Sequence, residues 1–527
     1  MPLKKDEYVI GVSSGFFAIA PQEEKEQYLT IMKKVFWGAQ KGVNFTQLDL
    51  ESITEFKEPF VENQIEKLRE LGIDFGIHGE TAATVREHTM PLDSATFDDY
   101  HRAHQRLIAH INGAIKLKAK YLLTHASESM PIPLSVTRDL GLTKSVDFWG
   151  RPLEVLLQEE TGKKVLEWAA EQKFIKESRH LSYAIGGEYE RVKREFLAAN
   201  KKKEEDLTQE EEARLYKLAG PLGIMKLVRE RDFDYGPERI PYLLIAKYME
   251  ITKDSIWVAI TGGKTVDELH NQYQKWVPAV AAKYLWGHFN PRSAEEYKRL
   301  GVPVMEDPKP LLEKGKLFFV LEPQMAQLGY EEHMRLHNIL HIYWLVRDIK
   351  SDWVGIAFDI EHTLSGNWDI KKEILPNMAD DMGKFVKVMH LGWPTTHVPA
   401  HIPIYLGSEA QQYIYEVLFE LRKKGFDRGW MIFERGGGQD PVKDSVVSLR
   451  NIVKYLLKDT PPDKLPLDFY GLEEEGGEVT RQLLIIKEHA LDPLKGVLHV
   501  PEEDFGILST GAAQKGKLEE WRKEKFK

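Results

Sequence analysis

The sequence predicts an α/β chain, folded as a (β/α)8 TIM barrel with a large, mainly helical insertion between strands 4 and 5 and a C-terminal extension. Eight short apolar runs occur along the chain, and each is followed by a segment with helical periodicity. The runs are continuously apolar rather than alternating, which is typical of strands buried on both faces of a parallel sheet. Eight such units favour a closed barrel over an open, doubly wound sheet.

The predicted elements follow one another regularly, apart from one interruption. Strands are expected at "YVIGV" 8–12, "VNFTQLDL" 43–50, "IDFGIH" 73–78, "AKYLLTH" 119–125, "LFFVLE" 317–322, "VGIAFD" 354–359, "FVKVMH" 385–390 and "GWMIFE" 429–434. Helices are expected at about 22–39, 61–71, 97–117, 332–350, 408–424 and 442–457.

This pattern divides the chain into a barrel, residues 1–125 and 315–458, an insertion at 126–314 and an extension at 459–527. The charged run at 201–217 within the insertion is interpreted as a solvated helical hairpin. Because the insertion leaves from the rim where barrel active sites lie, it is expected to cover the mouth as a lid.

Composition excludes several kinds of chemistry. The chain has no cysteine, so disulfides, thiolate ligands and a cysteine nucleophile are excluded. Its 527 residues carry a net charge of −10, which disfavours nucleic acid as a partner. No apolar run approaches the ~18 residues of a membrane span, so we expect a cytoplasmic protein. Abundant Lys and Glu without Cys also fit a heat-adapted, thermophilic origin.

The ends of strands three to eight carry side chains that bind metals. Histidines also follow strands six and seven, at His362 and His401. A single strand-end histidine is more often structural, and a strand-end acid often caps the next helix. As a converging set, however, these groups would be costly to bury without a cation. The sequence therefore predicts a polynuclear His/carboxylate site. Its six strand-end residues are His78, His125, Glu322, Asp359, His390 and Glu434.

This pattern resembles that of the xylose isomerase-like TIM barrels, and among them most closely endonuclease IV. That family closes strands three and four with His, carries a bridging Glu on strand five, Asp-x-x-His on strand six, His on strand seven and Glu on strand eight. The resemblance covers roughly 7–125 and 315–458. It implies one ion held by His78, His125 and Glu322, and a second held by Glu322, Asp359, His390 and Glu434.

A third ion is implied at His362 and His401. Here Pro399 stands where the family has Asp, and His397 is the candidate replacement. The ligands suit Mn²⁺ or Zn²⁺, so two or three divalent ions are expected.

The first functional hypothesis is a metal-dependent phosphoesterase (phosphatase), because two metals can clamp a phosphoryl group and activate water. Its predicted catalytic residues are Glu322, His362 and Glu434. Arg435 and His397 are expected to contact a small phosphorylated substrate. A DNA endonuclease specific for abasic sites is disfavoured by the acidic charge and by the insertion.

Two further hypotheses remain open. A sugar isomerase or epimerase of the same superfamily would use Glu322, Asp359, His390 and Glu434 around one ion, with the two glutamates moving protons. His78 and His125 favour the hydrolase, as does the lack of arginine between 391 and 421, where epimerase-type sites tend to place one. The third hypothesis is a non-catalytic protein with a structural metal, which the surplus of ligands disfavours.

Overall fold

The computed structural model describes residues 3–14, 30–50, 53–57, 61–79, 90–127, 145–173, 179–230, 240–323, 335–366, 368–395, 398–434 and 441–472. The chain divides into two compact units, Met1–Pro462 and Asp463–Lys527. The first unit contains the barrel and the inserted helices.

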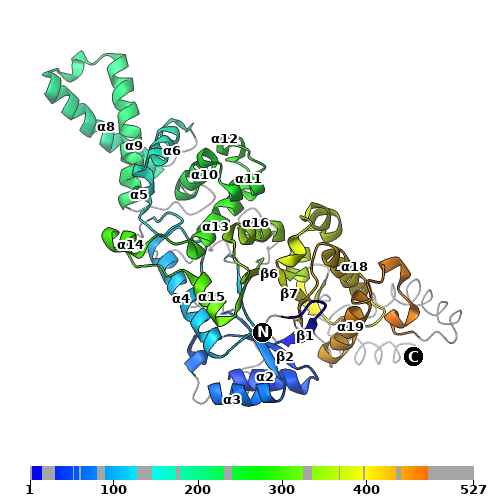
Figure 1. Ribbon diagram of the computed structural model, residues 1–527. Helices are drawn as coiled ribbons and strands as arrows, with labels where there is room; N and C mark the ends of the chain where they lie inside the picture. Colours follow the sequence, from blue (N-terminus) through cyan, green and yellow to red (C-terminus); the bar gives the residue numbers. More distant parts are fainter. Residues whose placement is uncertain are drawn as a thin grey trace, which may run out of the picture. The chain divides into compact units, whose positions relative to one another are not determined.

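Eight parallel strands close into a barrel in the order β1-β10-β7-β6-β5-β4-β3-β2, with β2 pairing back to β1 (Figure 1). The predicted (β/α)8 barrel is thereby confirmed. The barrel strands are β1 (Tyr8–Ser13), β2 (Phe45–Asp49), β3 (Asp74–His78), β4 (Tyr121–His125), β5 (Phe318–Glu322), β6 (Val354–Asp359), β7 (Val386–Leu391) and β10 (Gly429–Phe433). A separate antiparallel pair is formed by β8 (Trp393–Thr395) and β9 (Val398–Ile402).

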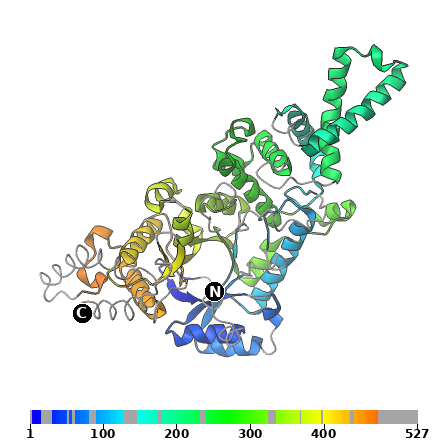
Figure 2. The ribbon, with the colours of Figure 1, turned by 180° about the vertical axis from the view of Figure 1, so that it is seen from behind.

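Helices cover the outside of the barrel, as both views show (Figures 1 and 2). They are α2 (Ile31–Gln40), α3 (Val61–Glu70), α4 (Phe97–Lys116), α16 (Ile339–Ile349), α17 (Ile360–Ser365), α18 (Glu409–Lys423) and α19 (Pro441–Leu456). Short helical turns are η2 (Ile53–Lys57), η5 (Glu204–Asp206), η7 (Ile370–Ile374), η8 (Leu375–Asn377), η9 (Met382–Lys384), η10 (Pro462–Lys464) and η11 (Leu467–Tyr470).

Polar caps determine where several barrel helices begin. The side chains of Thr30, Asn338 and Ser408 accept hydrogen bonds from backbone N–H groups in the first turns of α2, α16 and α18. Such caps satisfy donors that the helix itself leaves unpaired. The apolar stripe of each helix then packs on the strands, as in α18, where Ile414, Leu418 and neighbouring residues are buried.

Every second side chain along each strand points into the barrel and helps to fill its interior. Successive side chains of a strand point to opposite faces, so the inward set has a period of two. The buried cluster that spans the strands comprises Phe45, Tyr121, Leu123, Val320, Ala357, Val388, Trp430 and Ile432. This register matters for the site, because it decides which residues at the strand ends also point inward.

Between β4 and β5 the described chain is helical. Its helices are α5 (Leu153–Gln158), α6 (Glu160–Glu171), α8 (Arg179–Asn200), α9 (Gln209–Glu230), α10 (Ile240–Thr252), α11 (Ser255–Thr261), α12 (Val266–Leu269), α13 (Tyr273–Phe289), α14 (Ala294–Leu300) and α15 (Pro308–Gly315). Helices α8 and α9 run side by side as a hairpin, which confirms the helical hairpin predicted around 201–217 (Figure 1). The lid role stays a prediction. None of the described helices is long and apolar enough to cross a membrane.

The inserted helix α13 is docked onto the barrel helix α4 through buried polar contacts. The Tyr100 hydroxyl of α4 donates to the Phe148 carbonyl at 2.8 Å. His104 of α4 and His288 of α13 stack with their Nδ1 atoms 3.1 Å apart. The Glu306 N–H donates to His104 Nε2 at 3.1 Å, so His104 Nδ1 must carry the proton that is shared with His288.

The other nitrogen of His288, Nε2, extends this series of hydrogen bonds. His288 Nε2 lies 3.0 Å from the Leu92 carbonyl, to which it donates. Burial lowers the pKa of His104 to about 4, and the charge of His101 acts in the same direction. Burial also lowers the pKa of His288 well below its ordinary value, and there the charge of His104 acts in the same direction. Both histidines are therefore neutral in the folded protein.

We expect this histidine pair to make stability depend on pH. In the unfolded chain a histidine titrates near 6.5, so between pH 6.5 and about 4 the unfolded state binds more protons than the folded state. The stabilisation is complete above pH 6.5 and is lost as the pH falls toward 4, by about 3 kcal/mol for His104. Unfolding midpoints at pH 7.5, 6 and 5 should fall more steeply in wild type than in His104→Asn. Equal slopes would contradict the assignment.

Candidate metal centre

The register of the barrel brings the predicted ligands together. Five of the six lie two residues after a buried core residue of the same strand, as His390 follows Val388 on β7 and Glu434 follows Ile432 at the end of β10. The sixth, His78, lies two residues after Gly76, whose Cα faces the Tyr121 ring. All six therefore point inward at the carboxyl ends of the strands, where barrel active sites are built. Among the described residues, two groups have ligand atoms within 4.8 Å of one another. They are His78, His125 and Glu322, and Glu322, Asp359, His390 and Glu434.

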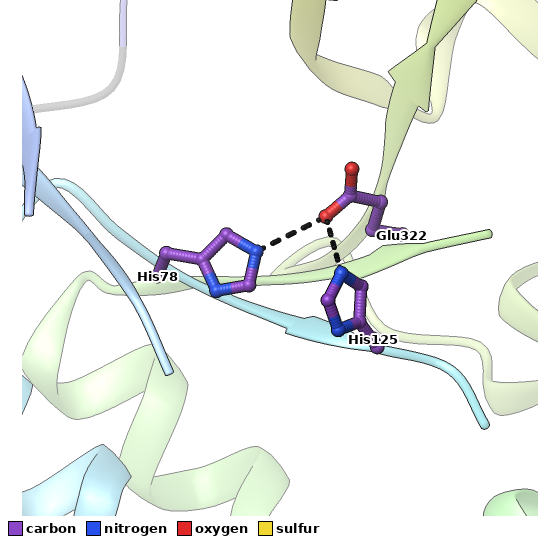
Figure 3. A group of neighbouring side chains, drawn as sticks. All are labelled: His78, His125 and Glu322. Carbon is purple, nitrogen blue, oxygen red and sulfur yellow. Dashed lines mark hydrogen bonds and ion pairs between the residues drawn. The ribbon is translucent and has the colours of Figure 1, made fainter. Parts of the chain in front are cut away.

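The first group, which we call the triad, converges on one oxygen (Figure 3). His78 Nε2 lies 3.2 Å from Glu322 Oε2, and His125 Nε2 lies 3.4 Å from the same oxygen. His78 Nδ1 lies 2.9 Å from the Gly79 carbonyl, to which it donates. That bond directs the Nε2 atom of His78 toward the triad, the arrangement that histidine ligands of metals usually have.

The second group, which we call the tetrad, surrounds His390. Its Nδ1 atom lies 2.8 Å from Glu322 Oε1, 3.2 Å from Glu434 Oε1 and 3.4 Å from Asp359 Oδ2. Asp359 also caps α17, because its Oδ1 accepts from the His362 N–H at 2.6 Å. The cap leaves Oδ2 directed at His390, so one carboxylate starts a helix and contributes to the cluster.

Glu322 belongs to both groups through different oxygens. Oε2 faces the triad and Oε1 faces the tetrad. The carboxyl group is completely buried. A carboxylate with one oxygen on each side is the arrangement needed to bridge two cations.

The charges of the cluster fit divalent cations. Burial would raise the pKa of Glu322, but His390, His78 and His362 outweigh it and hold that pKa well below its usual range. Burial would lower the pKa of His78 and His390, but the nearby carboxylates raise these pKa values, for His78 to about 9. Protons on these rings thus compensate the buried carboxylates, and a cation would supply the same compensation. Burial lowers the pKa of His125 to about 3, which leaves it neutral and able to ligate.

The structure describes only some of the remaining predicted site residues. His362 Nδ1 lies 3.3 Å from Glu322 Oε1 and 3.7 Å from Asp359 Oδ2, beside the tetrad but outside both groups. The backbone of His401 lies in β9, and its side chain is outside the described part. His397 and Arg435 also lie outside the described residues. The third ion and the roles assigned to these side chains stay predictions.

Strand β2 contributes polar residues that the sequence analysis missed. Gln47 and Asp49 continue the inward register of Phe45, and both lie near the metal ligands. Gln47 Nε2 donates to Glu434 Oε1 at 3.2 Å, and Asp49 is paired with His78 in register. The available signal was a pair of polar residues two positions apart, Gln47 and Asp49, on the face of β2 that begins with Phe45.

Comparison with known proteins gives structural likeness only. No family model matches the sequence, and no curated protein matches it. A D-tagatose 3-epimerase-like protein has a TM-score of 0.42 and 11% identity, over 86% of this chain and 100% of its own. D-psicose 3-epimerase, solved in the presence of D-fructose, has a TM-score of 0.40 and 10% identity, over 85% of this chain and 99% of its own. An IolI protein with a bound zinc atom has a TM-score of 0.35 and 8% identity, over 85% of this chain and 99% of its own.

These findings correct the predicted function. The similar structures are those of sugar epimerases and of a zinc-binding barrel, so the phosphoesterase hypothesis is contradicted. That hypothesis depended on His78 and His125 as ligands for an extra metal. A second cation polarises the oxygens of a sugar as well as those of a phosphate, so counting ligands does not distinguish the two reactions. What is confirmed is the fold, a closed barrel of eight parallel strands with ligand-type residues at the carboxyl ends of its strands.

Proposed function

We propose that this chain is a metal-dependent sugar isomerase or epimerase. The observation that carries the proposal is the tetrad, in which carboxylate oxygens of two glutamates, Glu322 and Glu434, approach the same His390 nitrogen at 2.8 and 3.2 Å. Epimerase-type sites of the resembling superfamily use this set of residues around one divalent ion, with both glutamates as proton-transfer groups.

The residues fit a cation by their chemistry and burial. Three carboxylates and one imidazole supply the oxygen and nitrogen donors that Mn²⁺ or Zn²⁺ accepts. The tetrad would hold one ion, and the triad would hold a second through the other oxygen of Glu322. When bound, such an ion supplies Lewis acidity that polarises a sugar carbonyl and its neighbouring hydroxyl.

The two glutamates would perform the proton transfers. One carboxylate takes the proton from the carbon next to the sugar carbonyl, and the electron pair of that C–H bond forms an enediolate. The other, protonated, glutamate returns a proton to the opposite face of the same carbon for epimerisation, or a proton is delivered to the neighbouring carbon for isomerisation. His362 Nδ1 lies 3.3 Å from Glu322 Oε1, and in this proposal His362 would contact a substrate hydroxyl.

The test is conversion of sugars by protein shown to be loaded with Mn²⁺ or Zn²⁺. The panel should contain aldoses and ketoses both free and phosphorylated, because a phosphorylated substrate remains a prediction. We expect interconversion of one sugar pair in D₂O to introduce solvent deuterium at the reacting carbon, and Glu434→Gln to lose this exchange. Failure of the metal-loaded protein to convert any sugar would contradict the proposal.

A further inference from the structure

A buried glutamine lies inside the barrel, in contact with the tetrad. Gln47 is completely buried and points into the barrel from β2, in the register of Phe45. A primary amide in such a place is costly unless both its oxygen and its nitrogen are hydrogen-bonded. Gln47 meets this condition with partners on β4, on β7 and directly after β10.

The partners determine the orientation of the amide. Gln47 Oε1 accepts from the Tyr121 hydroxyl at 3.0 Å and lies 2.9 Å from His390 Nε2. Gln47 Nε2 donates to Glu434 Oε1 at 3.2 Å. The carboxylate of Glu434 decides the orientation, because an ionised carboxylate only accepts and the opposite orientation would direct the amide oxygen at it.

A glycine in the neighbouring strand makes room for this contact. Gly76 of β3 is paired with Gln47 in register. A Cβ atom at position 76 would lie 2.2 Å from Cζ of Tyr121, closer than any real side chain tolerates. The missing side chain lets the Tyr121 ring lie across β3 and bring its hydroxyl to the amide.

The consequence for the tetrad concerns His390. Because the Gln47 oxygen takes the Nε2 proton of His390, the lone pair of the neutral ring is on Nδ1, which faces Glu322, Asp359 and Glu434. The same amide holds Glu434 Oε1 through its NH₂ group. A single side chain therefore fixes the tautomer of one ligand and the orientation of another.

We propose that Gln47 is a positioning residue for the tetrad, supported by Tyr121, and that it sets the cation affinity of this group without ligating the cation. The inference rests on the proposed function, in that it takes the tetrad to bind a cation. It makes no assumption about which sugar is converted.

The experiment compares cation binding by Gln47→Met with binding by wild type. Methionine keeps the length and apolar volume of the side chain and removes both polar ends. The probes are Zn²⁺ and Mn²⁺, measured with the full chain by competition with a chromophoric chelator. Thr46→Val is the matched control, because Thr46 is buried on the same strand facing away from Gln47, and its hydroxyl has no hydrogen-bond partner within the described ranges.

We expect Gln47→Met to lower the affinity for the ion held by the tetrad by about 10- to 100-fold. A second ion, held by the triad, and both ions of Thr46→Val should keep wild-type affinity. If Gln47→Met does not fold, Gln47→Asn decides, since its shorter amide cannot reach His390 and Glu434 together. Wild-type affinity in a folded Gln47 variant, or equal weakening of all ions, would overturn the inference. Because the readout is metal affinity, a wild-type protein that binds cations but converts no sugar would sink the proposed function and leave this test valid.

Discussion

Replacing Glu322 with glutamine is expected to abolish turnover and to remove at least one of two bound ions. Glutamine has the shape of the glutamate side chain but a single, uncharged oxygen, so it can serve one of the two groups at most. Wild-type Glu322 presents Oε2 to the triad and Oε1 to the tetrad. Loss of a metal that contributes several kcal/mol to transition-state stabilisation corresponds to a fall in turnover of about 10³-fold or more.

The stoichiometry of bound metal, measured by elemental analysis after exhaustive dialysis, checks this prediction. His125→Ala is the informative control, because His125 belongs to the triad alone and contacts Glu322 only through Oε2. We expect His125→Ala to lose one ion and to retain the ion of the tetrad. If Glu322→Gln keeps two ions at wild-type affinity, Glu322 does not bridge, and the two-ion arrangement is wrong.

The contrast between Glu322 and Gln47 shows what the sequence could reveal about the site. The barrel forces the carboxyl ends of its strands to one face, so a ligand-type residue at each strand end was enough to predict one cluster of ligands. Its division into the triad and the tetrad was implied by the family resemblance. Gln47 lies one register step before the end of its strand. Its role depends on a tyrosine from β4 and on the absence of a side chain at Gly76, which become neighbours only when the barrel closes.

Other features could not be predicted from the sequence for similar reasons. His104 and His288 are 184 residues apart in the chain and meet only because the insertion returns to α4. The reaction itself was misassigned, because the same ligands can polarise a phosphoryl group or a sugar carbonyl. Strand boundaries, in contrast, were predicted closely: β6 has the bounds expected from its apolar run.

Gly287→Ala is expected to destabilise the protein by about 3 kcal/mol or more, against the usual effect of this substitution. In an exposed helix, alanine is favoured over glycine by about 1 kcal/mol. Gly287, however, lies in α13 where the insertion docks, and a Cβ atom there would be 1.5 Å from the Phe148 carbonyl oxygen and 2.8 Å from the Tyr100 hydroxyl. The obstacle is backbone rather than a flexible side chain, so the helix itself must move, at a cost at or above the upper end of the overpacking range.

Gly187→Ala is the matched control, because Gly187 lies within α8 and a Cβ atom there would meet nothing within 4 Å. We expect the thermal unfolding midpoint to fall for Gly287→Ala and to stay or rise for Gly187→Ala. A midpoint that is unchanged in Gly287→Ala would show that α13 does not approach the Phe148 backbone this closely. The triad and tetrad draw their ligands from the barrel strands and, with Glu434, from the residue directly after β10, and they contain none from α13. Gly287→Ala should therefore bind metal with wild-type stoichiometry at temperatures where it is folded, since what it weakens is the packing of α13 against Phe148 and Tyr100.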